Sequence, residues 1–306
     1  MIAGSETTFA GGSSTPPPPA VTLPDASSLF DRRAKRLAAW ADGHPMAEYL
    51  TFLSHLAAAQ HRAAVSGETP VLADARALSQ ARAGGMPLLP RQVSGLDGQW
   101  RKVLADILRE MAALSLPPEA RQVVERLSSE EPALLDSRAA GFLLFQKTGS
   151  DLAADLFVAS ALQVVWAKAA EALDPSLPQT LDPPGLCPVC GSPPVAGIVM
   201  AAEPLEGVRY LGCGLCGCHW HYPRATCSSC GSDKDIGYLS LEGMVGHARG
   251  ETCGECRTYL KLFDEEKSTG AEPFADDLAT LGLDLRLAED GWHRALANPF
   301  LMAEPG

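Results

Sequence analysis

The sequence predicts a protein of mixed α and β class, with an all-α N-terminal domain of several helices, two tandem metal modules of the zinc-ribbon type and a C-terminal helix. Apolar residues recur at helical spacing over most of residues 26–173, whereas all nine cysteines lie between Cys187 and Cys256. A chain of 306 residues has room for about two domains of ordinary size. We therefore expect a disordered tail at 1–25, a helical domain at 26–180, metal modules at 181–222 and 223–268, and a C-terminal helix at 269–306 that packs back on the protein.

The N-terminal segment has the composition of a disordered tail rather than of a targeting signal. Of its first 24 residues, 18 are Ala, Gly, Ser, Thr or Pro. The pair Arg32-Arg33 is followed by Ala34-Lys35-Arg36, where a twin-arginine export signal would need an apolar stretch. We also expect that no run approaches the roughly 20 apolar residues of a membrane span. These features predict a soluble, cytoplasmic protein with no membrane insertion.

Three stretches of the helical domain, residues 45–64, 100–114 and 152–173, carry clear helical stripes. Each has apolar residues three and four positions apart, so each helix must bury one face against its neighbours. The domain contains no catalytic motif, and we interpret it as a structural or docking domain. Proline and glycine cluster at residues 174–185 and mark its end. A last helix should begin near Pro273, because apolar residues from Phe274 to Trp292 follow one stripe.

The cysteines form a duplication with a period of 40 residues. Each unit has the spacing Cys-x2-Cys-x22-Cys-x2-Cys, and Gly191 and Gly231 share the same shift. In such a unit two tight turns each present two sulfurs to one metal ion, which predicts one tetrathiolate site per unit and two metal ions per chain. The predicted ligands are Cys187, Cys190, Cys213 and Cys216 in the first unit, and Cys227, Cys230, Cys253 and Cys256 in the second.

Both units should depend on their metal to fold. About 40 residues provide too little core for independent stability, and structural zinc supplies roughly 10–16 kcal/mol. Gly191 and Gly231 follow the second cysteine of a turn, where a positive φ is often needed. Short strands are expected near residues 198–200 and 238–240. Because a tetrathiolate site suits zinc and iron equally, the spacing does not name the ion.

Other arrangements of the cysteines are possible on spacing alone. Cys213/Cys216 could share a metal with Cys227/Cys230 across ten residues, which would leave the two outer pairs to meet; the duplication favours the first pairing. A thioredoxin-like redox site would need one Cys-x-x-Cys pair beside a βαβ pattern, and that pattern is absent. We therefore expect metal binding rather than dithiol chemistry.

One cysteine, two histidines and a basic run lie outside the predicted ligand set. Cys218 stands outside the repeat, and we interpret it as a small buried hydrophobe beside the first site rather than a reactive thiol or exchanging ligand. His219 and His221 are expected in structural or surface roles, since four cysteines are already available. We interpret the run Arg32, Arg33, Lys35 and Arg36 as the solvated face of a helix, with a docking patch for an acidic partner as the alternative.

Several short segments accompany the cysteine repeat. They are Cys187-Pro-Val-Cys-Gly-Ser-Pro-Pro194, Arg209-Tyr-Leu211, Cys213-Gly-Leu-Cys216, Trp220-His221, Cys227-Ser-Ser-Cys230, Glu251-Thr-Cys-Gly-Glu-Cys256, Tyr259-Leu-Lys261, Ala275-Asp-Asp-Leu-Ala279 and Asn298-Pro-Phe-Leu301. Together these segments resemble the FdhE family, accessory proteins required for making active respiratory formate dehydrogenases. Weaker likeness extends to Arg32-Arg33-Ala34 and Tyr49-Leu50, and Cys218 departs from the family pattern.

The resemblance implies a helical domain followed by two rubredoxin-like modules, with iron favoured as the metal and zinc as the alternative. It implies a cytoplasmic, non-catalytic maturation factor that binds the immature catalytic subunit of a molybdenum- or tungsten-dependent formate dehydrogenase. Self-association of the chain is compatible with this role. A second hypothesis is rubredoxin-like electron transfer or redox work on that partner. Iron would then give thiolate-to-iron absorption that bleaches on reduction.

A zinc-ribbon nucleic-acid binder is the third hypothesis, and the charge argues against it. The chain has 25 Lys and Arg against 37 Asp and Glu, a net charge of −12. Between residues 187 and 256 four basic residues face seven acidic ones. Because nucleic-acid binding draws on phosphate contacts from a basic face, we expect no nucleic-acid partner.

Overall fold

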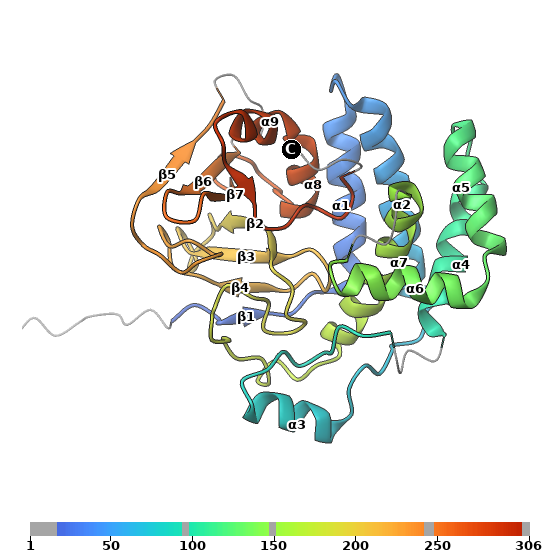
Figure 1. The fold of residues 1–306 in the computed structure, drawn as a ribbon, viewed down its shortest axis with the longest axis horizontal. Helices are drawn as coiled ribbons and strands as arrows, with labels where there is room; N and C mark the ends of the chain where they lie inside the picture. Colours follow the sequence, from blue (N-terminus) through green and yellow to red (C-terminus); the bar gives the residue numbers. More distant parts are fainter. Residues whose placement is uncertain (1–16, 94–97, 147–150, 242–247, 302–306) are drawn as a thin grey trace, which may run out of the picture.

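The computed structural model describes residues 17–93, 98–146, 151–241 and 248–301. Over these ranges a helical bundle lies beside one β-sheet, and two short C-terminal helices cover part of the sheet next to the bundle (Figure 1). The helices are α1 Ala26–Ala41, α2 Ala47–Ser66, α3 Ala75–Ala83, α4 Gln99–Ala112, α5 Pro118–Ser129, α6 Pro132–Leu143, α7 Leu152–Glu171, α8 Pro273–Ala279 and α9 Leu281–Glu289. The strands are β1 Val21–Thr22, β2 Pro194–Val199, β3 Arg209–Cys213, β4 His219–His221, β5 Ile236–Leu239, β6 Arg249–Cys253, β7 Thr258–Asp264 and β8 His293–Arg294.

The central helix of the bundle is α7, which is apolar around its whole circumference. It contacts α1, α2, α4, α5 and α6, so nearly all of its residues are buried. Among the described helices, α7 has the length and composition of a membrane span, which corrects the expectation that no run approaches one. However, 83% of its most apolar window is buried inside the protein. A helix enclosed by other helices is apolar on every side for that reason.

Both cysteine modules contribute strands to one continuous sheet, rather than to two separate ribbons. The strand order is β1-β4-β3-β2-β7-β6-β5, with β8 beside β7. The modules join where β2 of the first runs parallel to β7 of the second, with Gly197 opposite Leu262. A Cβ atom at Gly197 would lie 2.5 Å from the Leu262 side chain, so this close approach requires glycine.

The end of the predicted disordered tail belongs to the sheet. Residues 1–16 lie outside the described residues, but Val21–Thr22 form β1, antiparallel to β4. The Tyr210 hydroxyl donates to the Pro19 carbonyl at 3.0 Å, and the His221 N–H donates to the Ala20 carbonyl at 2.9 Å. The prediction for residues 19–22 was therefore wrong, because the edge of the first module supplies hydrogen-bond partners that the segment lacks by itself.

The predicted C-terminal helix is divided into α8 and α9. Thr280, with φ −114° and ψ 32°, separates them, and its hydroxyl donates to the Asp276 carbonyl at 2.8 Å. All of α8 is buried, with contacts to α1 on one side and to β2 and β7 on the other. The apolar stripe continues through the break, so sequence periodicity alone does not reveal it.

A buried ionic network attaches these two helices to the sheet. The Lys261 ammonium of β7 is fully buried and lies 2.9 Å from Asp277 and 2.6 Å from Asp284. Arg294 donates to Asp277 at 3.1 Å and also pairs with Asp284. Burial opposes ionisation of Asp277, but Arg294 and Lys261 outweigh it and lower the pKa of that carboxyl. Two cations thus balance two carboxylates in the interior.

The basic run on α1 joins the helical bundle to α8 and is not a solvated face. Arg33 is 3% exposed, lies 3.1 Å from Glu272 and stacks 3.9 Å from the centre of the Phe274 ring. Arg36 donates to Asp276, which is fully buried. The other two members of the run are exposed. The surface interpretation was wrong for Arg33 and Arg36, because Glu272 at the start of α8 and Asp276 within it supply their carboxylate partners 239 and 240 positions further along the chain.

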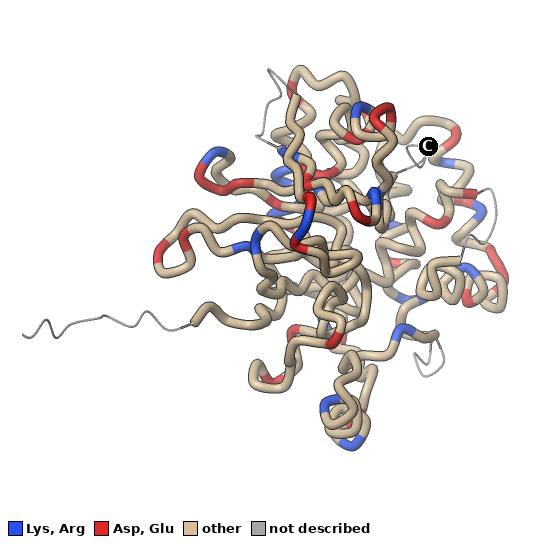
Figure 2. Tube along the Cα trace, turned by 60° about the vertical axis from the view of Figure 1, so that its left-hand side comes forward, with Lys and Arg blue, Asp and Glu red and all other residues tan. Residues whose placement is uncertain are grey.

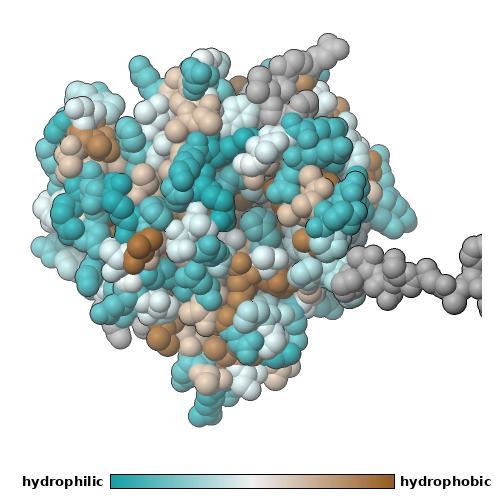
Figure 3. Space-filling model, turned by 180° about the vertical axis from the view of Figure 1, so that it is seen from behind, coloured by the Kyte–Doolittle hydropathy of each residue, from teal (hydrophilic) through white to brown (hydrophobic). Residues whose placement is uncertain are grey.

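The segment that carries α3 extends away from the bundle and then returns to the first cysteine turn. No residue of α3 is buried, and in Figure 3 the surface is mostly hydrophilic, with apolar residues gathered beside this lowest projection. Beyond α3, the Leu88 and Leu89 amides donate to the carbonyls of Pro188 and Val189 at 3.4 and 2.7 Å. The segment therefore covers the loop between the first two cysteines.

We expect the substitution Lys261→Met to destabilise the protein by about 3–5 kcal/mol, because two carboxylates would lose their buried cation. The matched control is Lys35→Met, which removes an exposed pair with Asp31 and should leave the stability almost unchanged. Urea unfolding of both variants measures the difference. Equal costs would show that the buried network does not hold the C-terminal helices.

Candidate metal centre

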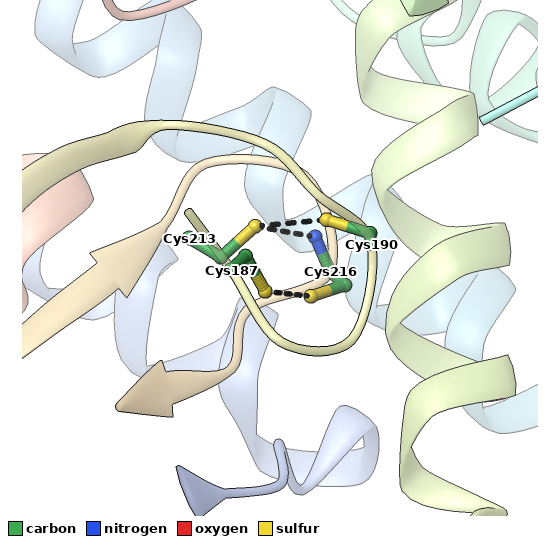
Figure 4. Close-up of side chains that lie close together, drawn as sticks. All are labelled: Cys187, Cys190, Cys213 and Cys216. Atoms are coloured by element: carbon green, nitrogen blue, oxygen red, sulfur yellow. Dashed lines mark hydrogen bonds between the residues drawn. The ribbon is translucent and has the colours of Figure 1, made fainter. Parts of the chain in front are cut away.

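The eight predicted cysteines gather in two groups of four, as the 40-residue repeat predicts. Cys187, Cys190, Cys213 and Cys216 form site 1, and Cys227, Cys230, Cys253 and Cys256 form site 2; within each site all sulfurs lie within 4.8 Å of one another. All nine cysteines are free thiols. The alternative in which the inner pairs share one metal is therefore wrong. Figure 4 shows the four side chains of site 1 converging from two loops beside α7.

The spacing of the sulfurs fits a tetrahedral metal ion. In site 1 the Cys187 and Cys216 sulfurs are 3.5 Å apart and those of Cys190 and Cys213 are 3.3 Å apart. The two corresponding distances in site 2 are 3.6 and 3.7 Å. A tetrahedron with metal–sulfur bonds of about 2.3 Å has sulfurs about 3.8 Å apart. A small outward movement of each sulfur would therefore complete either site.

Both sites are built on the same turn. The Cys187 N–H donates to the Ser192 carbonyl and the Gly191 N–H donates to the Cys187 carbonyl, both at 2.8 Å, and the same two bonds recur forty residues on. Gly191 and Gly231 have φ +74°, as predicted. The Cys216 N–H points at the Cys213 sulfur at 3.4 Å (Figure 4), which spreads the negative charge of a thiolate.

Without a cation, four adjacent thiols cannot all ionise. Burial and neighbouring thiols raise the pKa of Cys213 and Cys216 well above the ordinary value. Burial also opposes ionisation of Cys187, but hydrogen bonds from neighbouring thiols outweigh it and hold the pKa of Cys187 well below that value. One thiolate among several protonated thiols is the expected result of mutual repulsion. A divalent ion would remove this constraint, so the residues present fit a metal.

Site 1 is enclosed by the helical domain. The Gln163 side chain of α7 donates to the Gly214 carbonyl, inside the second turn of the site, at 2.7 Å. A Cβ atom at Gly217 would lie 2.6 Å from Leu29 of α1, and one at Gly191 would lie 2.9 Å from Pro87. All four cysteines of site 1 are buried. The repeat by itself gives no sign of this enclosure, because the covering residues come from distant segments.

Site 2 lies at the surface. Cys230 is exposed and Cys256 is half-buried. Burial would raise the pKa of Cys256, but hydrogen bonds from Thr258 and the neighbouring thiols outweigh it and lower the pKa to about 7. Nothing lies within 4 Å of a Cβ built at Gly231, and the position equivalent to Gly217 is Arg257, whose φ is +60°. The same scaffold therefore presents one enclosed and one accessible site.

Cys218 occupies in site 1 the place that Thr258 takes in site 2. The two residues are 40 positions apart, and the Thr258 hydroxyl lies 3.0 Å from the Cys256 sulfur. Cys218 is fully buried, and its carbonyl accepts a hydrogen bond from the Cys213 N–H at 2.9 Å. It is thus buried beside site 1, as expected. Neither of the neighbouring histidines belongs to a cysteine group.

A buried ion pair links the two modules between their sites. Arg209 of β3 lies 2.6 Å from Glu251 of β6, and both side chains are almost fully buried. Arg209 also donates to the carbonyls of Pro223 and Thr226 at 3.1 Å each, just before Cys227. In the sequence, Arg209 was indicated only as part of the segment Arg209-Tyr-Leu211, which carries the family resemblance. Its role depends on the pairing of the modules, which the repeat does not specify.

The charged residues do not form a basic stripe along the chain. Figure 2 shows Lys and Arg interspersed with Asp and Glu along the described trace. This distribution agrees with the acidic composition of the modules and gives no support to a nucleic-acid interface.

We expect Gly191→Ala to destabilise the metal-loaded protein more than Gly231→Ala. Each variant places a side chain at φ +74°, which costs about 1–2 kcal/mol, but only the first also meets Pro87. The extra contact should add about 1–3 kcal/mol. Urea unfolding midpoints measure the difference, and equal midpoints would show that the helical domain does not press on site 1.

We expect metal to leave the two sites at different rates. When the chain carries two zinc ions, excess chelator should remove about one ion quickly from site 2 and the other slowly from site 1. The double variant Cys227→Ser/Cys230→Ser should lack the fast phase. Cys187→Ser/Cys190→Ser should unfold the first module and lose about one metal per chain. Release of both ions in one phase would contradict the difference in enclosure.

Comparisons with known proteins cover most of the chain. Family models described as "FdhE, N-terminal", "FdhE, central domain" and "FdhE, C-terminal domain" match residues 18–182, 186–224 and 225–301. A protein described as "Protein FdhE homolog" from Edwardsiella ictaluri is 38% identical over 285 residues, covering 91% of this chain and 90% of that protein. The homolog from Pseudomonas aeruginosa is 38% identical over 287 residues, covering 91% of both chains.

A solved structure is similar throughout. The crystal structure of the FdhE protein from Pseudomonas aeruginosa matches with a TM-score of 0.83 and 35% identity, covering 93% of this chain and 99% of that one. It shares the mixed helical and sheet architecture described above. On the family models, the curated relatives and this structure together, the chain belongs to the FdhE family.

Proposed function

We propose that this protein is a non-catalytic maturation factor that binds the immature catalytic subunit of a respiratory formate dehydrogenase in the cytoplasm. Family membership identifies a formate dehydrogenase accessory protein, and it is the observation that carries the proposal. The architecture supports it: a helical bundle and a sheet are joined by buried ion pairs into a scaffold that carries two tetracysteine sites.

In this proposal the metals stabilise the scaffold. The four sulfurs of each site would hold one ion, with iron favoured by the family resemblance and zinc as the alternative. Such an ion cross-links two turns that are 22 residues apart in sequence and neutralises closely packed thiolates. Site 1 would secure the contact between the modules and the helical domain. Site 2 would stabilise the free end of the sheet, where a partner can reach it.

Electron transfer or redox work on the same partner is the second candidate function. Exposure of Cys230 and the half-buried position of Cys256 favour it, because electron exchange needs an accessible centre. Iron in site 2 would show thiolate-to-iron absorption that bleaches on reduction. Stoichiometric zinc without a redox response would exclude this candidate and leave the scaffold function intact.

We expect the tagged full-length chain to retain a formate dehydrogenase catalytic subunit on purification from its own cells. Deletion of the gene should abolish most formate oxidation, and the intact gene should restore it. Lys35→Met, an exposed change on α1, serves as the control that should retain the partner. If the chain never retains that subunit and deletion leaves formate oxidation intact, the proposed function is wrong.

A further inference from the structure

The outer edge of β5 is open. β5 is the last strand of the sheet and lies at the end away from the helical bundle (Figure 1). Its inner edge pairs with β6, and no described strand pairs with its outer edge. Tyr238 and Leu239 are 48% and 38% exposed, so large apolar side chains accompany the open edge. Backbone groups at such an edge are available to an added strand.

The internal repeat shows what this kind of edge accepts. The 40-residue shift places residues 236–239 of β5 on residues 196–199 of β2, and each position is glycine or apolar in both strands. In the first module β7 runs parallel along the equivalent edge, with Gly197 opposite Leu262 and Ile198 opposite Phe263. The edge of β5 is therefore equivalent to one that already carries a parallel neighbour.

A second copy of the chain cannot continue this pattern in the same way. The first-module equivalent of β7 is β4, and β1 of the same chain pairs with the outer edge of β4. In head-to-tail pairing, β5 of one copy would pair with the outer edge of β4 in the next copy. β1 would then have to leave that edge. Covering an edge in this way is how natural sheets avoid open-ended assembly. The repeat thus favours a strand from a different polypeptide.

Acidic residues at the start of β5 restrict the chemistry of that strand. Asp233 and Asp235 are exposed and precede β5, with Lys234 between them. The exposed Glu255 follows Gly254, whose N–H donates to the Asp235 carbonyl at 2.9 Å. A strand added in parallel would place its N-terminal end beside these carboxylates. A positive charge at that end is complementary to them.

We propose that the outer edge of β5 docks an extended segment of a partner polypeptide as a parallel strand, with alternating apolar side chains and a Lys or Arg at its N-terminal end. The inference rests on the proposed function for the identity of the partner, and it names the surface that the partner contacts. Because Ile236 of β5 lies opposite Cys253 of β6, only β5 would separate the docked strand from this ligand of site 2.

Hydrogen–deuterium exchange of the full metal-loaded chain tests this docking. The probe is a synthetic peptide with the sequence of residues 257–265, Arg-Thr-Tyr-Leu-Lys-Leu-Phe-Asp-Glu, which copies β7 and begins with a cation. At saturation it should slow exchange of residues 236–239 several-fold. Only alternate backbone amides of the bound peptide would face β5. N-methylation of the peptide amides that face β5 should therefore abolish the slowing, whereas N-methylation of the amides that face away should preserve it.

Matched variants locate the effect. Leu239→Lys should abolish the slowing, whereas Leu285→Lys, which alters a leucine of α9 that is 54% exposed, should preserve it.

No slowing of exchange at millimolar peptide, or slowing only outside β5, overturns the proposal. Protection of β5 in the free chain that rises with protein concentration also overturns it, in favour of pairing between copies. If the peptide protects β5 but a formate dehydrogenase catalytic subunit does not, the docking edge stands and the proposed partner is wrong.

Discussion

The buried pairing of Lys261 with Asp277 and Asp284 is the interaction on which the rest of the architecture depends. It holds α8 and α9 against β7, and α8 in turn supplies the carboxylates that bind Arg33 and Arg36 of α1. Because α1 also packs against the second turn of site 1, the enclosure of that site depends on this chain of contacts. Isolated charges of this kind would be strongly unfavourable in the interior, so the partners must be assembled together.

The two cysteine modules show how one duplicated unit acquires two environments. Their turns share the same hydrogen bonds and the same positive φ, so the local geometry of four sulfurs is retained. They differ in what surrounds them: Leu29, Pro87 and Gln163 close on site 1, whereas the equivalent side of site 2 is open. The pair Cys218 and Thr258 shows the same divergence, because a thiol replaces a hydroxyl where the environment is fully buried.

The edges of the sheet extend this contrast. The β4 edge is covered by β1, and the β2 edge by β7, whereas β5 at the far end has an open edge and exposed apolar side chains. The accessible metal site and the open edge therefore lie in the same module, away from the helical bundle. A scaffold with one end enclosed and the other accessible is well suited to hold a second protein without burying its own core.

The sequence by itself determined the two cysteine groups, the helical character of the first half and the boundary between them. Spacing carries this information because each cysteine turn and each amphipathic helix is a local structure. Only the tertiary structure decided that Arg33 is buried and Arg36 pairs with a buried carboxylate, that Thr280 divides the last helix, and that both modules share a sheet closed at one edge by β1. Each of these features depends on contacts between segments far apart in the chain, and residue periodicity holds no record of which distant segment provides the partner.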